Sequence, residues 1–283
     1  MDGFTPSATA SGAAMLRAAH LLVDDEPKIF RDEWAVLFLD ERRRTMAANR
    51  AAIGTDITRA SRSTVTARAA LTEAELDTFI AGGGSQYVLL GAGYDSFALR
   101  RGDAAPHVTV FEVDHPQTQN AKRAQLRNGG VIEPANVRYA PVDFETQDAA
   151  AELVKAGWRR DRPTFFSWLG VTMYLTDAAT FATLELVAAC PRGSAVAFQY
   201  SVKGSTVLAS DLDIRARASV GVAAQGEPWI NFYEPDVLVS RLFAAGFSEV
   251  DDLRSAELQP RYFAERTDGL WWPSTNGMAI ARV

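Results

Sequence analysis

Short apolar runs alternate with longer segments of helical spacing through the middle of the chain. Buried strands are expected at residues 87–90, 108–113, 137–142, 164–169 and 195–200. Between them, helical spacing of the apolar residues predicts amphipathic helices at 117–128, 148–156 and 177–189. Strands and helices that alternate at this period predict a parallel sheet built from right-handed βαβ units.

The chain before this alternation has helical spacing. Helices are expected at 11–23 with Ser11 as N-cap, at 32–39 with Asp32 as N-cap, and at 56–81. The triplet Gly82-Gly83-Gly84 is a strong stop signal before the first strand. Residues 1–85 are therefore predicted to form a helical extension outside the sheet.

The alternation ends after Tyr200. A weakly patterned helix is expected within 205–227, a clearer one at 235–245 that ends at Gly246, and two closing strands at 249–253 and 278–283. With the N-terminal extension, this predicts four parts: the extension 1–85, a core 86–200, a helical insertion or lid 201–233, and a C-terminal completion of the sheet 234–283.

A glycine turn follows the first predicted strand, in Leu90-Gly91-Ala92-Gly93. The first glycine of such a turn permits a sharp bend, and the second lets a ligand approach bare backbone. The second predicted strand ends in Asp114, 21 positions after Gly93. An acid at this place accepts hydrogen bonds from the hydroxyls of a ribose. The pattern therefore predicts a nucleotide-type cofactor at the carboxyl ends of the strands.

Two cofactors use this geometry. A dinucleotide favours a third glycine, where this chain has Ser96, and the chain also lacks a Tyr-x-x-x-Lys pair. S-adenosylmethionine has no phosphate and needs only the turn and the acid. The incomplete fingerprint favours S-adenosylmethionine and leaves NAD as an alternative.

Four segments occur in order at spacings that fit successive βα units. They read LGAGYDSFALR (90–100), FEVDHP (111–116), PVDFE (141–145) and GVTMYLT (170–176). Together they resemble the leucine carboxyl methyltransferase family, which includes protein-phosphatase carboxyl methyltransferases and bacterial polyketide carboxyl methyltransferases. The resemblance covers about residues 59–176. It implies an α/β fold with a Rossmann-like class I methyltransferase sheet of about seven mostly parallel strands, with S-adenosylmethionine as methyl donor and S-adenosylhomocysteine as product.

The strand ends and the resemblance together suggest a cofactor site. Its expected residues are Arg68, Gly91, Ala92, Gly93, Asp95, Asp114, His115, Asp143, Phe144 and Tyr174. The resemblance implies that Arg68 pairs with the cofactor carboxylate, that Asp143 accepts from the adenine amino group, and that Tyr174 lines the pocket. Phe144 either covers the purine or packs only on protein. Arg59 and Arg62 compete with Arg68, and Glu112 either touches the site or forms an internal ion pair.

The chain departs from the family pattern at two positions. Leu169 stands where many members have a glutamate before the glycine of the fourth-strand motif, which puts a contact to the cofactor's amino group in doubt. Phe97 stands where many have an arginine, while Arg100 remains as a possible partner in a buried ion pair. Neither departure removes the expected pocket.

Composition narrows the function classes. The 283 residues carry a net charge of −6 and a pI near 5.2, which disfavours a nucleic-acid surface. The single Cys190 excludes an intramolecular disulfide framework and offers no thiolate cluster for zinc, so no metal is expected. No targeting segment or run of about 20 apolar residues is recognised, which predicts a cytoplasmic protein without a membrane partner.

The acceptor decides whether a base is needed. A carboxylate is already anionic at neutral pH, whereas a phenol would gain from a base. The weak catalytic candidates are Tyr174 and His20, and the scarcity of histidines favours a carboxylate. The predicted partner is a small hydrophobic acceptor with a carboxylate or hydroxyl, as in secondary metabolism, and the resemblance leaves a protein C-terminus as the alternative acceptor. Its apolar wall is expected from Trp168, Met173, Trp229, Phe232, Tyr233, Trp271 and Trp272.

Three hypotheses follow from these observations. The first is an O-methyltransferase that uses S-adenosylmethionine. The second is a protein of the same fold that has lost methyl transfer and serves for binding, for scaffolding or for other chemistry of this cofactor. The third is an NAD(P) oxidoreductase. The oligomeric state has no sequence signal.

Overall fold

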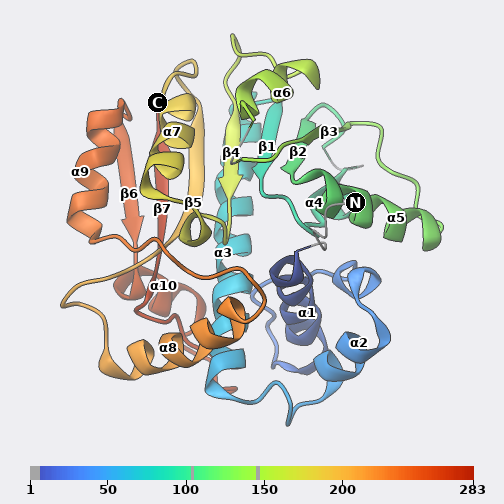
Figure 1. Cartoon of the computed structure of the whole chain (residues 1–283), viewed down its shortest axis with the longest axis vertical. Coiled ribbons are helices and arrows are strands. Elements are labelled where there is room, and N and C mark those ends of the chain that lie inside the picture. Colours follow the sequence, from blue (N-terminus) through green and yellow to red (C-terminus); the bar gives the residue numbers. More distant parts are fainter. Residues whose placement is uncertain (1–6, 103–104, 145–146) are drawn as a thin grey trace.

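A computed structural model describes residues 7–102, 105–144 and 147–283 of the chain. Glu145, the last residue of the PVDFE segment, lies outside them. Within the described residues one seven-stranded sheet forms the centre of the molecule (Figure 1). Its spatial order is β3 (Val137–Pro141), β2 (Thr109–Asp114), β1 (Gln86–Leu90), β4 (Phe165–Trp168), β5 (Ala195–Ser201), β7 (Asn276–Arg282) and β6 (Glu249–Leu253).

The strand directions confirm the predicted fold class. The β3–β2–β1–β4–β5 pairs are parallel, whereas β7 runs antiparallel to both β5 and β6. The chain order reverses between β1 and β4, and open α/β sheets bind ligands at such a switch point, outside the carboxyl ends of their strands. Gly91 follows β1 there and Gly170 lies two residues beyond β4.

Helices cover both faces of the sheet. One apolar cluster packs α6 (Ala149–Lys155), α7 (Asp177–Ala188) and α9 (Pro235–Ala245) on one face. A second cluster packs α3 (Asp56–Ala81), the short α4 (Phe97–Arg101) and α10 (Ser255–Tyr262) on the other face. Figure 1 shows α3 crossing behind the sheet. The strands β1, β4 and β5 are therefore buried on both sides, which explains why they read as apolar runs.

The N-terminal helices form a third apolar cluster. It joins α1 (Ala8–Val23), the 3₁₀ turn η1 (Ala35–Phe38) and α2 (Glu41–Ala48) with Tyr94 and with Leu126 of α5 (Pro116–Asn128). The remaining elements are η2 (Thr172–Tyr174) and α8 (Ala209–Ala223). The division into parts at residues 85, 200 and 233 stays a prediction.

Some helix starts and lengths predicted from the sequence differ from those in the structure. Helix α1 starts at Ala8 and is capped by the hydroxyl of Ser7, so Ser11 is not its N-cap. The helix expected at 32–39 is only the turn η1, while Asp32 accepts from the Ala35 N–H through Oδ1 at 3.1 Å and pairs with Arg17 through Oδ2. Two helices had no clear sequence signal: α2 lacks an apolar face, and α10 contains Pro260.

No helix in the described part of the chain is long and apolar enough to cross a membrane.

Candidate active site

The glycine turn after β1 is held by the neighbouring strand. The N–H groups of Gly91 and Ala92 both donate to the carbonyl of Val113, at 2.8 and 3.0 Å. Gly91 and Gly93 have φ values of 68° and 50°, which L side chains rarely adopt. A Cβ on Gly91 would lie 2.5 Å from Cγ2 of Val171, just after β4. Glycine is therefore needed both for the turn and for its close approach to the segment after β4.

The acid after β2 closes onto the same turn. Oδ2 of Asp114 accepts from the Gly93 N–H at 2.6 Å, and Oδ1 accepts from the His115 N–H at 2.7 Å. Burial raises the pKa of Asp114, and these two donors act against the rise. His115 caps α5 through Nδ1, which accepts from the Gln117 N–H at 3.3 Å. The structure thus places Asp114 and His115 beside the glycine turn.

The start of α1 lies over this turn. A Cβ on Gly93 would stand 3.1 Å from Cβ of Ala10, and the Ser7 N–H donates to the Thr118 hydroxyl of α5 at 3.4 Å. The N-terminal extension therefore covers the carboxyl ends of β1 and β2.

The third strand brings Asp143 to the same edge. The Val142 N–H donates to the Asp114 carbonyl at 2.9 Å, so the two acids follow neighbouring strands. Asp143 begins a turn in which its N–H donates to Oε1 of Gln147 at 2.9 Å. The Phe144 ring packs in part against the core.

Arg68 comes from the middle of α3 and reaches the end of β4. A Cβ on Gly170 would stand 2.5 Å from its Nη1 atom. Nη1 donates to Oε1 of Gln199 in β5. Among the described residues no carboxylate oxygen lies within 4.0 Å of the Arg68 guanidinium, although Asp95 acts on it from farther away. Burial, and then the positive charge of Arg17, lowers the pKa of Arg68 to about 10. This is a partly buried cation without a bound anion.

Arg62 and Arg59, the alternatives to Arg68 as the cofactor-binding arginine, lie next to other acids. Arg62 holds Asp24 through two bonds, Nε–Oδ2 at 2.7 Å and Nη2–Oδ1 at 2.9 Å. Arg59 is partly exposed and its Nη1 atom lies 3.9 Å from Oδ1 of Asp56. The geometry therefore singles out Arg68 as the arginine at the end of β4.

Glu112 and Arg100, whose roles the sequence left open, both form internal ion pairs. Glu112 is buried and bonds Nζ of Lys122 at 2.6 Å. Arg100 pairs with Glu73, with 3.1 Å between Nη1 and Oε2. Phe97 is buried against Tyr87, with ring centroids 4.8 Å apart, and Leu169 packs on the same apolar cluster. Both family departures thus add apolar packing beside the site.

The two weak catalytic candidates differ. His20 is buried, its Nδ1 lies 2.8 Å from Oδ2 of Asp24, and its Nε2 accepts from the Ile29 N–H at 3.0 Å. Both ring nitrogens are engaged, so His20 has none free to take a proton from an acceptor. Tyr174 ends η2 and is only partly buried. Burial raises its pKa, against the opposing effects of the Trp229 and Thr9 side chains.

Sequence reasoning missed Gln199 and Asn276. Nε2 of Gln199 donates to Oδ1 of Asn276, at the start of β7, at 2.9 Å. The signal was a single glutamine near the end of the apolar run 195–200, where a buried polar side chain needs partners.

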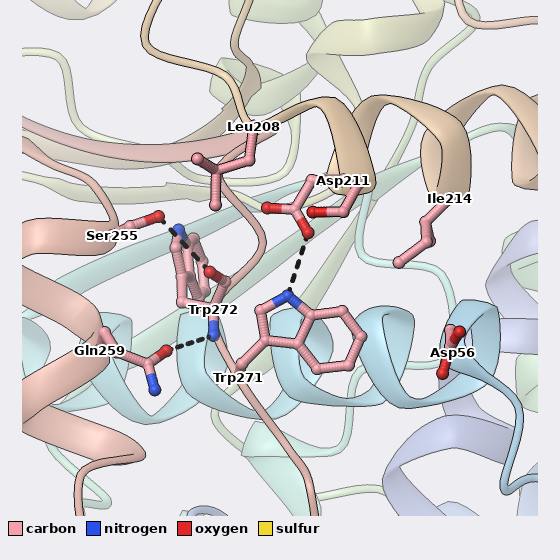
Figure 2. A pocket seen from close by; sticks show the side chains of 9 residues that line it. Asp56, Leu208, Asp211, Ile214, Ser255, Gln259, Trp271 and Trp272 are labelled. Carbon is pink, nitrogen blue, oxygen red and sulfur yellow. Dashed lines mark hydrogen bonds between the residues drawn. The ribbon is translucent and has the colours of Figure 1, made fainter.

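A separate cavity of about 490 Å³ lies among α3, α8 and α10 (Figure 2). Its lining residues are Asp56, Leu208, Ser210, Asp211, Ile214, Ser255, Gln259, Trp271 and Trp272. Trp271 donates through Nε1 to Oδ1 of Asp211 at 3.2 Å, and Figure 2 shows its indole spread beneath α8. None of the expected cofactor residues lines this cavity.

The expected apolar wall is only partly there. Trp271 and Trp272 line the cavity, but Trp168 and Tyr233 are buried in the core. In the part of the chain that the structure describes, no group of three or more His, Cys, Asp and Glu side chains could hold a metal ion.

Comparisons with known proteins agree with this architecture. The family model of leucine carboxyl methyltransferases matches residues 10–188. The "Putative S-adenosyl-L-methionine-dependent methyltransferase YktD" of Bacillus subtilis is 31% identical over 206 residues, which cover 72% of this chain and 67% of that protein. A "Putative S-adenosyl-L-methionine-dependent methyltransferase" of Mycolicibacterium smegmatis is 34% identical over 197 residues, which cover 65% of this chain and 61% of that protein. This chain thus spans about two thirds of the lengths of these relatives.

Solved structures share the fold. A DUF574 family protein from Streptomyces avermitilis superposes with a TM-score of 0.59 and 14% identity, covering 96% of both chains. The N-terminal domain of EvdMO1, crystallised with S-adenosylhomocysteine bound, gives a TM-score of 0.50 and 14% identity over 76% of this chain and 81% of that domain. These likenesses show the fold alone.

Proposed function

The chain belongs to the leucine carboxyl methyltransferase family of enzymes that use S-adenosylmethionine, and we propose that it methylates a carboxylate or hydroxyl of a small hydrophobic acceptor. The observation that carries the proposal is the Arg68 guanidinium at the switch point of the sheet, beside the Gly91–Gly93 turn and its acid; no carboxylate of the described residues pairs with it.

The residues at the switch point fit the cofactor. S-adenosylmethionine, when bound, supplies a methyl group already activated by a sulfonium. It also carries a carboxylate, and within the described ranges no carboxylate pairs with the Arg68 cation. A planar guanidinium suits a carboxylate because it offers two parallel donors. We therefore assign Arg68 to the carboxylate of the cofactor.

The other expected residues take roles along the strand ends. Asp114 accepts hydrogen bonds from the ribose, with His115 beside it, and Asp143 accepts from the adenine amino group with Phe144 near the ring. The turn of Gly91, Ala92 and Gly93 passes under the methionine part, with Asp95 following it. Tyr174 lines the pocket from η2. The adjacency of the ends of β1, β2 and β3 supports this order.

The chain's own contribution to the reaction is alignment and exclusion of water. A carboxylate acceptor needs no base, and His20 has both ring nitrogens engaged. This favours a carboxylate over a hydroxyl. The start of α1 covers the glycine turn and serves to shield the reacting centre.

The cavity in Figure 2 is proposed to hold the apolar body of the acceptor. Its volume of about 490 Å³ suits a small molecule. The N–H of Trp271 donates to the Ser63 hydroxyl of α3 at 3.3 Å, and Ser63 lies five residues before Arg68. One helix therefore connects the cavity to the cofactor side.

The test is methyl transfer from S-adenosylmethionine with a tritiated methyl group. Hydrophobic acids are assayed beside alcohols and phenols of the same skeleton. A methyl ester releases volatile label in alkali, whereas a methyl ether does not. Calorimetric titration with S-adenosylhomocysteine precedes the assay. Binding without transfer to any acceptor would favour a binding or scaffolding role instead.

A matched pair of variants tests the cavity. Ile214→Trp fills it, whereas Val220→Trp adds the same bulk to an exposed place on α8, where the Val220 side chain is 70% exposed. We expect the first variant to raise the KM for the acceptor at least tenfold and the second to leave it unchanged. Equal effects would remove the cavity from the acceptor site.

A further inference from the structure

Gln199 is a buried amide at the end of an apolar strand. Its side chain is 3% exposed, and every residue of β5 is buried. Burying an amide is costly unless its donors and acceptor are bonded. Its partners therefore say what the residue is for.

Both ends of the amide are engaged. Oε1 accepts from Nη1 of Arg68, and Nε2 donates to Oδ1 of Asn276 at 2.9 Å. Asn276 in turn donates through Nδ2 to the Thr64 hydroxyl at 3.5 Å, and Thr64 belongs to the same helix as Arg68. Because the nitrogen end is held by Asn276, the oxygen end faces the arginine.

Gln199 is an uncharged partner for Arg68, and this distinguishes Arg68 from several other arginines. Three other buried or partly buried arginines are paired with acids: Arg17 with Asp32, Arg62 with Asp24 and Arg100 with Glu73. Arg215 donates to the Val202 carbonyl. Arg68 likewise receives an uncharged oxygen, and no carboxylate pairs with it among the residues that the structure describes. A guanidinium has five donors, so the bond to Gln199 leaves others for a ligand.

We propose that Gln199 is a positioning residue that holds Arg68 in place while leaving its charge for the carboxylate of the cofactor. The inference rests on the proposed role of Arg68. A glutamate at position 199 would have nearly the same shape, but it would pair with Arg68 and repel the incoming carboxylate. The site thus requires a neutral hydrogen-bond acceptor here.

The experiment compares two ligands by calorimetry. S-adenosylhomocysteine has the carboxylate, whereas 5′-methylthioadenosine keeps the adenine, ribose and sulfur and lacks the amino-acid part. For Gln199→Glu we expect S-adenosylhomocysteine to bind at least tenfold more weakly, with 5′-methylthioadenosine within twofold of the unmodified protein. Gln225→Glu, which makes the same charge change on an exposed part of the chain, should leave both affinities unchanged.

Two further variants keep the outcomes separate. Gln199→Leu removes the bond without adding charge, and we expect a selective loss of three- to tenfold for S-adenosylhomocysteine. Binding of 5′-methylthioadenosine reports whether each variant is folded. If the glutamate variant is not folded, Gln199→Leu provides the test in its place. Arg68→Ala should show the same selectivity.

The results that would overturn the inference are distinct. If Arg68→Ala loses S-adenosylhomocysteine selectively but Gln199→Glu and Gln199→Leu bind it normally, Gln199 does not position the arginine. An equal loss of both ligands in the Gln199 variants would mean a general structural role. If Arg68→Ala binds both ligands normally, the assignment of Arg68 fails, and the inference about Gln199 fails with it.

Discussion

The main-chain N–H of Gly93 donates to the Asp114 carboxylate at 2.6 Å, which ties the turn after β1 to the acid after β2. The two parts of the motif are thus one structure before any ligand arrives. Oδ1 is held by His115 in the same way. Because each oxygen can accept a second hydrogen bond, the carboxylate can still receive ribose hydroxyls.

Removing this carboxylate should weaken cofactor binding. We expect Asp114→Ala to lose about 1–3 kcal/mol of binding free energy for S-adenosylhomocysteine, the usual scale for hydrogen bonds to a charged acceptor. Calorimetric titration measures it, and Asp143→Ala, where one adenine contact is at stake, should lose less. Unchanged affinity in a folded Asp114→Ala protein would exclude Asp114 from the site.

The raised pKa of Asp114 gives binding a pH dependence. Burial disfavours the ionised carboxylate, whereas donor hydroxyls of a ribose favour it. Binding should therefore lower this pKa, so the affinity for S-adenosylhomocysteine should rise as pH increases through the raised value and then level off. The Asp114→Asn variant should show a flatter profile. An affinity that falls over this range, or an identical profile in the variant, would contradict the assignment.

A side chain at Gly91 should be strongly destabilising. Gly91→Ala places a Cβ at positive φ, which costs about 1–2 kcal/mol, and brings it 2.5 Å from Cγ2 of Val171. Chemical denaturation measures the loss. Adding Val171→Ala should recover the part due to the clash and leave the part due to φ. If Val171→Ala recovers no stability, the whole loss is due to the backbone conformation at position 91 and none to the clash.

Arg68 is expected to serve binding at the expense of stability. Among the described residues no carboxylate pairs with its partly buried charge, but Arg68 also bonds the buried amide oxygen of Gln199. In a Gln199→Leu background, which has no such oxygen to leave unpaired, Arg68→Met should therefore leave the melting temperature unchanged or raise it. The same variant should bind S-adenosylhomocysteine at least tenfold more weakly. A clear fall in melting temperature would indicate that Arg68 is mainly a structural residue.

The buried Arg62–Asp24 pair should matter for stability in acid. Burial alone would raise the pKa of Asp24, but the hydrogen bonds with His20 and Arg62 outweigh it and hold the pKa below its ordinary value of 3.8. A lowered carboxyl pKa stabilises the fold above 3.8, and this contribution is lost as pH falls through the lowered value.

Breaking this pair tests the argument. We expect Arg62→Met to cost about 3–5 kcal/mol at pH 7, because it leaves a buried carboxylate without its cation. Denaturation with urea at pH 7 and pH 3 measures both terms, and the loss should be smaller at the lower pH. The exposed Arg217→Met, which breaks a surface pair with Asp213, should cost less than about 1 kcal/mol.

Local pattern was enough for much of the fold. The predicted limits of α3, α9 and β6 agree with the structure, because periodicity, a glycine stop or a proline start acts within a few residues. The sequence also predicted that Gly93 and Asp114 lie at the carboxyl ends of parallel strands, and the structure shows them in contact. The sheet was predictable from such signals, whereas the family and the choice of S-adenosylmethionine over NAD came from the resemblance of the four motif segments.

Long-range pairing decided the rest. Residues 32–39 have helical spacing, but they form only one 3₁₀ turn, and the buried pair of Asp32 with Arg17 was not visible in the sequence. The spatial neighbours of His20 and Arg62 also had to come from the structure. Both side chains contact Asp24, which leaves Arg68 as the arginine at the proposed cofactor site. Arg68 and Gln199 lie 131 positions apart, and only the crossing of α3 over the sheet brings them together. The sequence therefore determined most of the elements through local pattern. The free energy of burying a charge depends on every neighbour, so only the tertiary structure decided which side chains keep a charge without an acidic partner.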